Sequence, residues 1–228
     1  MADKIIIRKL TPLGDDGKSG YKREYFLEDK KIAAEVLSET MDTLSFDGKI
    51  PDGTVMELYE SGKTYFECPY KNGARNGVSR TYTESGAVTV EKEYKDGLLD
   101  GLVRVYYPTG HLQKEIFYKA DLQHGRQTKY YAGGKLMELS YYKDGLLDGD
   151  FITYSESGAV HSRAFYRDDK LEGDKVLYHD NGAIAVVSPH KNGKTHGMTK
   201  KYNDDGSLAE EWYFENGALM FKKEYPKG

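Results

Sequence analysis

A spacing of 24 residues runs through almost the whole chain. Tyr94 and Tyr118 open two segments of this length, and Tyr142 follows at the same interval. The series continues forward to Tyr166, His190 and Phe214, and back to Tyr70 and Phe46. A fixed period in this range indicates a repeat architecture, and it constrains the fold more than any local pattern does.

Four further sets of equivalent positions, here called columns, recur with the same period. The first holds glycine: Gly77, Gly101, Gly125, Gly149, Gly173 and Gly197. Five residues later comes tyrosine: Tyr82, Tyr106, Tyr130, Tyr154, Tyr178 and Tyr202. Four residues after that comes a second glycine: Gly86, Gly110, Gly134, Gly158, Gly182 and Gly206. Two residues further lies an aliphatic side chain: Val88, Leu112, Leu136, Val160, Ile184 and Leu208.

Each repeat reads as a β-hairpin. The residues between the two glycines, such as 102–106, are the β-branched and aromatic types that favour strands. Turns such as Pro108–Gly110 provide the positive φ of a tight reversal, and segments such as Asp96–Gly97 reverse the chain again. The pattern predicts an all-β fold: an elongated, single-layer antiparallel array of about seven hairpins.

Successive side chains of a strand point to opposite faces. The opening aromatic, the column tyrosine and the aliphatic residue occupy odd positions of the repeat, so they share one face unless a bulge shifts the count. Further aromatic residues occupy even positions: Tyr107, Phe117, Tyr131, Tyr141, Phe165 and Tyr213. Exposed rows of this kind are typical of protein interfaces, so these six residues are the predicted partner-binding residues. The alternative is that they pack against one another as cross-strand pairs.

The columns resemble the MORN repeat in its bacterial variant, which reads approximately Y-x-[ND]-G-x-x-x-G-x-x-x-x-Y-x-x-x-G-x-aliphatic. The resemblance covers residues 46–221 and implies a MORN-like meander or solenoid. Bacterial proteins with this variant are commonly grouped as YwqK-type antitoxins, which implies a partner protein, a toxin or effector, that the chain would neutralise. Asp121 and Asp169 depart from the pattern where glycine is usual, and His190 replaces an opening tyrosine. Distorted or terminal units are expected there.

Three segments are expected on this basis. Residues 1–45 form a degenerate N-terminal capping segment, residues 46–221 the MORN-like array, and residues 222–228 a C-terminal edge strand or tail. Arrays of this kind end in atypical units because an exposed terminal strand invites association with other chains.

The capping segment is the least regular part of the sequence. The apolar run Ile5–Leu10 predicts an edge strand, followed by a polar turn at 14–20. Alternation from Tyr21 to Leu27 favours a hairpin in residues 21–45. A short helix around Ile32–Leu37 is the alternative.

Composition and charge argue against nucleic-acid binding and against membrane binding. The formal net charge of −4 argues against nucleic-acid binding, and the lack of a basic amphipathic helix argues against direct binding to a membrane. Cys68 is the only cysteine, so no internal disulfide can form. No stretch has the length and apolar character of a transmembrane helix, and no signal peptide is apparent, so a cytoplasmic location is expected.

No motif predicts catalysis, a cofactor or a metal. Gly62–Thr64 and Gly193–Thr195 resemble the end of a phosphate-binding loop but lack its upstream glycine. His179, His190 and His196 are close in sequence, yet a metal site needs further ligands. The turn carboxylates are too few for a calcium loop. The sequence therefore predicts a non-enzymatic protein-binding protein. The alternative is a structural or self-associating scaffold, including a homo-oligomer or an assembly at a membrane surface.

Overall fold

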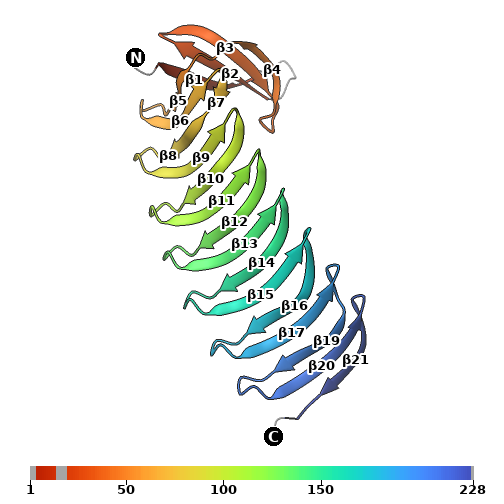
Figure 1. Cartoon of the computed structure of the whole chain (residues 1–228). Helices are drawn as coiled ribbons and strands as arrows, with labels where there is room; N and C mark the ends of the chain where they lie inside the picture. The colour runs from red at the N-terminus through yellow and green to blue at the C-terminus, as the bar shows by residue number, and fades with distance from the viewer. Residues whose placement is uncertain (1–3, 14–19, 227–228) are drawn as a thin grey trace. The chain divides into compact units, whose positions relative to one another are not determined.

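The computed structural model describes residues 4–13 and 20–226 (Figure 1). All regular structure in this part of the chain is β-strand, paired almost everywhere in antiparallel hairpins, as the repeat predicts. The chain divides into two compact units, one ending at Gly110 and the other beginning at His111.

The first unit holds ten strands. They are β1 (Ile5–Pro12), β2 (Tyr21–Leu27), β3 (Lys30–Leu37), β4 (Thr43–Gly48), β5 (Gly53–Leu58), β6 (Thr64–Lys71), β7 (Ala74–Arg75), β8 (Gly77–Tyr82), β9 (Val88–Lys95) and β10 (Leu98–Tyr106). Their order in space is β4-β3-β2-β1-β5-β6-β8-β9-β10, and the short β7 pairs with β6 beside β8.

Strand β1 lies inside this sheet. It pairs antiparallel with β2 and parallel with β5, where Ile5 lies opposite Thr54. The prediction of an edge strand for this run was therefore wrong, because Ile6 and Arg8 are buried with strands on both sides. The polar turn predicted at 14–20 lies, apart from Gly20, outside the described residues.

Residues 21–37 form the predicted hairpin, β2 and β3, and not the alternative helix. Its tip, Glu28 and Asp29, has positive φ at both residues, as a type I′ turn requires. The hairpin contributes Tyr25 and Ala33 to a buried cluster with Ile6, Ile50 and Val55. This cluster is the apolar core of the first unit.

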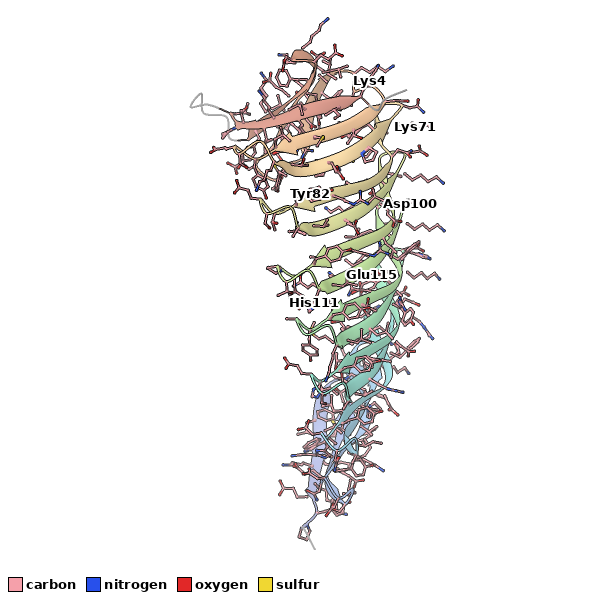
Figure 2. The ribbon with its side chains drawn as sticks, turned by 90° about the vertical axis from the view of Figure 1, so that its left-hand side faces the viewer. Lys4, Lys71, Tyr82, Asp100, His111 and Glu115 are labelled. Carbon is pink, nitrogen blue, oxygen red and sulfur yellow. The ribbon has the colours of Figure 1, made fainter. Side chains whose placement is uncertain are left out.

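The second unit is a meander of eleven strands. They are β11 (Leu112–Lys119), β12 (Leu122–Tyr130), β13 (Leu136–Lys143), β14 (Leu146–Tyr154), β15 (Val160–Arg167), β16 (Lys170–Tyr178), β17 (Ile184–Lys191), β18 (Lys194–Thr195), β19 (Gly197–Tyr202), β20 (Leu208–Glu215) and β21 (Ala218–Glu224). Each long strand pairs with its sequence neighbours, and the short β18 pairs with β17 beside β19. Side chains stand on both faces of a single layer of strands (Figure 2).

Two kinds of turn alternate along this meander, so each kind lies along one edge of the layer. The shorter kind has two residues with positive φ, such as Asp144 and Gly145 with φ of 50° and 90°. Asp168 and Asp169 keep this geometry without a glycine, with φ of 48° and 62°. The expected distortion at Asp121 and Asp169 was therefore wrong, since aspartate tolerates the left-handed region better than most residues.

Bulges recur at two places in the hairpins. Lys129 pairs with Glu138 whereas the next residue, Tyr130, pairs with Leu136, which leaves one residue extra. A second shift lies around the column glycine, for example Gly149 on β14. A bulge changes which face the following side chains occupy, so a simple odd–even count along the repeat does not hold.

Candidate protein-interaction surface

A row of buried side chains crosses the strands of the second unit. The register of the antiparallel pairing places five residues directly opposite one another on successive strands: Ile116, Gln127, Ser140, Phe151 and Ala164. All but the half-buried Phe151 are buried, and Ser140 is fully buried. This row marks the inner face of the layer.

Three of the predicted strand-end aromatics, Phe117, Tyr141 and Phe165, directly follow the buried Ile116, Ser140 and Ala164 and so point to the opposite, outer face. Phe117, Tyr141 and Phe165 are 38%, 36% and 39% exposed. They belong to β11, β13 and β15, so successive rings are about 10 Å apart, which is two strand spacings. We call these three residues the aromatic row.

Two rings of the aromatic row lie close to the column glycine of the next strand. A side chain at Gly149 would place its Cβ 2.9 Å from the Cβ of Tyr141, and one at Gly125 would lie 3.8 Å from Cδ1 of Phe117. Gly149 also has a φ of 129°, which other residues rarely adopt. The side chains of Tyr141 and Phe117 therefore lie beside the column glycine of the next strand, whereas a Cβ at Gly173, the corresponding glycine after Phe165, would have no neighbour within 4 Å.

The other predicted residues have different surroundings. Tyr213 continues the same column, but its ring stacks on Phe221 with centroids 5.8 Å apart. The hydroxyl of Tyr131 donates to the carbonyl oxygen of Tyr154 at 2.7 Å and so links two successive repeats. Tyr107 belongs to the first unit. The structure brings together Phe117, Tyr141 and Phe165, and the binding role of all six residues stays a prediction.

Charged residues alternate with the rings. Arg126 lies directly opposite Tyr141, and Asp150 lies opposite Phe165. All four side chains are exposed. The outer face thus combines apolar contact area with charges of both signs, as protein interfaces do.

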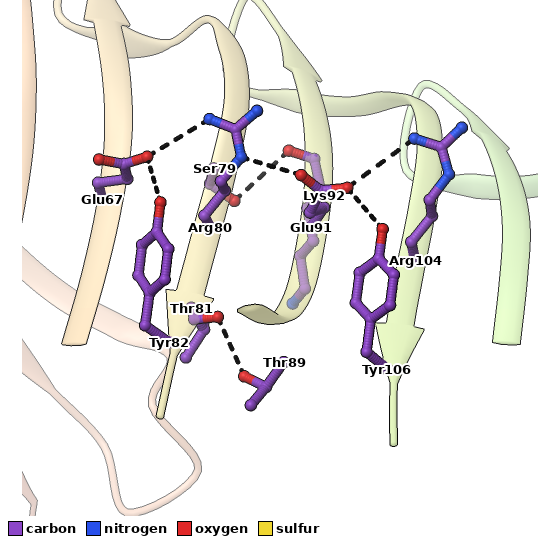
Figure 3. Close-up of polar contacts among 10 residues, drawn as sticks. All are labelled: Glu67, Ser79, Arg80, Thr81, Tyr82, Thr89, Glu91, Lys92, Arg104 and Tyr106. Carbon is purple, nitrogen blue, oxygen red and sulfur yellow. Dashed lines mark hydrogen bonds and ion pairs between the residues drawn. The ribbon is translucent and has the colours of Figure 1, made fainter. Parts of the chain in front are cut away.

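A ladder of charges crosses strands β6 to β10 of the first unit (Figure 3). The Arg80 guanidinium lies 2.9 Å from Glu91 and 3.4 Å from Glu67, and Arg104 lies 4.0 Å from Glu91. Sequence reasoning missed this ladder. The signal was present, because Glu67, Glu91 and Glu115 recur at the repeat spacing, as do Arg80 and Arg104.

Two column tyrosines complete the ladder. Tyr82 donates its hydroxyl to Glu67 at 2.6 Å, and Tyr106 donates to Glu91 at 2.8 Å. Partial burial, together with the bond to Glu67, raises the pKa of Tyr82 to about 12. Burial alone would raise the pKa of Glu91, but the bonds from Tyr106 and Arg80 outweigh it and lower that pKa. The ladder joins each hairpin to the next through side chains.

These contacts also correct the predicted faces. Tyr94 lies against Arg75, whose guanidinium carbon is 5.2 Å from the ring centroid, whereas Tyr106 contacts Glu91. Tyr94 and Glu91 are three residues apart on one strand, so they point to opposite faces. The expectation that opening and column tyrosines share a face was wrong because of the bulges.

Residues considered for other chemistry lie apart. His179 contacts the carbonyl of Tyr202 at 3.0 Å, and His190 contacts that of Ser188 at 2.8 Å. Within residues 4–13 and 20–226, no three His, Cys, Asp or Glu side chains are grouped as a metal site would require. Cys68 is buried, and burial raises the pKa of its thiol to about 11. No helix in this part of the chain could cross a membrane.

Comparison with protein families gives one result. The model of the MORN repeat variant matches residues 51–72, 99–120, 123–144 and 195–216. The second and third segments contain two members of the aromatic row, Phe117 and Tyr141. Comparison with curated proteins gives no match.

Proposed function

We propose that this chain, a protein of MORN variant repeats, is a non-enzymatic binding protein that holds another protein against the aromatic row. Repeat arrays generally act by binding. The observation that carries the proposal is the exposure of Phe117, Tyr141 and Phe165 at one position of three successive repeats.

The arrangement suits binding for a physical reason. Aromatic rings bring a large contact area with few rotatable bonds, so they lose little conformational entropy on association. The backbone under them is a hydrogen-bonded antiparallel sheet, which holds the three rings at a fixed spacing. Little reorganisation is then required of this surface, which favours affinity.

The finer proposal is that the partner is a toxin-like effector and that the chain neutralises it, as the resemblance to YwqK-type antitoxins suggests. Neutralisation would act by occupying the effector's surface, with one chain consumed per effector. The mixed charges of Arg126 and Asp150 beside the rings favour a partner surface that also carries both signs.

The test is capture of a partner by the intact protein, followed by mass spectrometry. The triple variant Phe117→Ala, Tyr141→Ala, Phe165→Ala should lose the partner, with affinity lower by about a hundredfold or more. Tyr65→Ala is the matched control, since Tyr65 is similarly exposed in the first unit and outside the row. Binding that survives the triple variant, or the absence of any stoichiometric partner, would reject the proposal.

A second function is favoured by strand β21. Leu219, Met220 and Phe221 are 54%, 56% and 47% exposed, and among the described strands β21 pairs only with β20. An exposed apolar edge promotes pairing between chains, as a self-associating scaffold requires. Sedimentation of the chain over a range of concentrations separates the two functions: a dimer that Leu219→Lys abolishes would support the scaffold.

A further inference from the structure

A pocket of about 720 Å³ lies in the first unit, apart from the aromatic row. Three segments distant in sequence form it: the residues at the start of β1, the connection from β4 to β5, and the end of β6. It exists only where the repeat is broken, because β1 replaces the antiparallel neighbour that β5 would otherwise have.

Positive charge converges on this pocket. Lys4, Lys49 and Lys71 line it, and Lys4 and Lys71 stand at the same edge of the strands in Figure 2. Among the described residues that line the pocket, Asp52 is the one carboxylate, and its Oδ1 accepts the backbone N–H of Asn72 at 2.6 Å. The described lining residues therefore carry an excess of positive charge.

The floor of the pocket is apolar and firmly held. Ile50 is buried and belongs to the core cluster with Ile6 and Val55, and Tyr70 packs against that cluster. Pro51 and Pro69, which have few conformations, line the walls. A site of this shape is formed before any ligand arrives, and its size is that of pockets for small organic molecules.

We propose that this pocket binds a small organic anion, with a carboxylate or phosphate held by the three lysines and an apolar body on the floor formed by Ile50 and Tyr70. A lysine ammonium is a compact charge that binds either kind of anion without requiring a fixed orientation. The anion is a free small molecule or the last residue of a peptide, since both present the same chemistry.

Lys71, at the end of β6, can be compared with the equivalent lysine of the next repeat. The following hairpin carries Lys95 at the same place of the repeat, without the strand and connection that close the pocket around Lys71. A charge effect specific to the pocket should therefore depend on Lys71 and not on Lys95.

The test is titration of the full chain with phenylacetate and phenyl phosphate, with benzyl alcohol as the uncharged probe, followed by calorimetry or NMR. The charged probes should bind, more weakly as salt is raised, and the alcohol should not. Lys49→Gln or Lys71→Gln should each weaken binding about tenfold, and Lys95→Gln should leave it unchanged.

Two peptides that end in phenylalanine, one with a free carboxylate and one amidated, separate the two sources of the anion. Tighter binding of the free peptide than of phenylacetate would assign a peptide terminus, and weaker binding would assign a free small molecule. Binding of benzyl alcohol equal to that of the charged probes, equal losses in Lys95→Gln, or no binding of either charged probe would overturn the proposal. None of these results bears on the aromatic row, whose test uses other residues.

Discussion

Strands β1 to β5 and the hairpins of the second unit bury different side chains. The opening strands enclose Ile6, Tyr25 and Val55, which are almost fully buried. In the second unit the row across the inner face mixes the polar Gln127 and Ser140 with Ile116, Ala164 and the half-buried Phe151. A single layer of strands has no opposing layer, so its side chains are buried by their neighbours on adjacent strands.

The buried polar contacts of the opening strands also differ from those of the second unit. In the opening strands, Glu35 accepts hydrogen bonds from Arg23 at 2.7 Å and from Tyr25 at 2.6 Å, so an ion pair is buried. In the second unit, the Gln127 amide donates to Ser140 and to Glu138 at 3.2 Å. The opening strands are stabilised by one specific core, whereas the hairpins are stabilised by many small contacts that recur with the period.

The largest effect is expected for Ile6→Ala. The side chain is fully buried in the core cluster, so its truncation leaves a cavity and should lower the free energy of unfolding by about 2–5 kcal/mol. Ile5→Ala is the control, because Ile5 is mostly exposed. Urea denaturation followed by circular dichroism measures both. Equal losses would mean that the opening strands have no specific core.

A smaller loss, about 1–3 kcal/mol, is expected for Glu35→Gln, which removes the charge that Arg23 and Tyr25 contact. Burial alone would raise the pKa of Glu35, but the bonds from Tyr25, Arg23 and Thr43 outweigh it and keep that pKa below its usual value. The stabilisation is therefore complete above the unfolded-state pKa of about 4.3 and is lost as the pH falls through the lower folded-state value.

The difference between the wild type and Glu35→Gln should thus shrink in acid. Denaturation at a series of pH values measures it, and Glu39→Gln serves as the exposed control. A difference that stays constant down to acidic pH would show that the carboxylate charge of Glu35 does not stabilise the fold.

In the second unit, Gly149→Ala should cost about 1–2 kcal/mol, because alanine is strained at a φ of 129° and its Cβ would lie 2.9 Å from that of Tyr141. Gly133→Ala should have little effect, since Gly133 has open space and no positive φ in this range. Thermal unfolding distinguishes the two variants. If they lose equal stability, the column glycine is not required by the bulge.

The smallest effect on stability is expected on the outer face. Phe165→Ala should change the free energy of unfolding by about 0.5 kcal/mol or less, because the ring is 39% exposed. Chemical denaturation tests this expectation, with the buried Ala164→Gly as a reference of larger effect. A large loss for Phe165→Ala would favour the cross-strand packing alternative over a free binding surface.

Much of the fold could be predicted from local pattern. The period, the tight turns and the hairpin of residues 21–37 follow from residue types a few positions apart. The pairing of β1 with β5 could not, because Ile5 and Thr54 are distant in sequence and no periodic signal links them. The faces of the column tyrosines depended on bulges that the residue count did not include.

The candidate surface, too, could be predicted only in part from local pattern. Alternation along the strands was enough to select Phe117, Tyr141 and Phe165 as a set. It did not distinguish them from Tyr131, whose hydroxyl bonds to the next repeat, or from Tyr213, which stacks on Phe221. The lysine pocket was not predicted at all, because Lys4 joins Lys49 and Lys71 in its lining only through the pairing of β1 with β5.

The sequence by itself determined the repeating hairpins, since positive φ at turns and alternation along strands depend on residues close to one another in the chain. The tertiary structure alone decided which face each tyrosine occupies, which aromatic rings stay exposed and which pocket Lys4 and Lys71 line together. These features depend on bulges and on one long-range strand pairing, whose energies come from contacts that form only after distant segments come together.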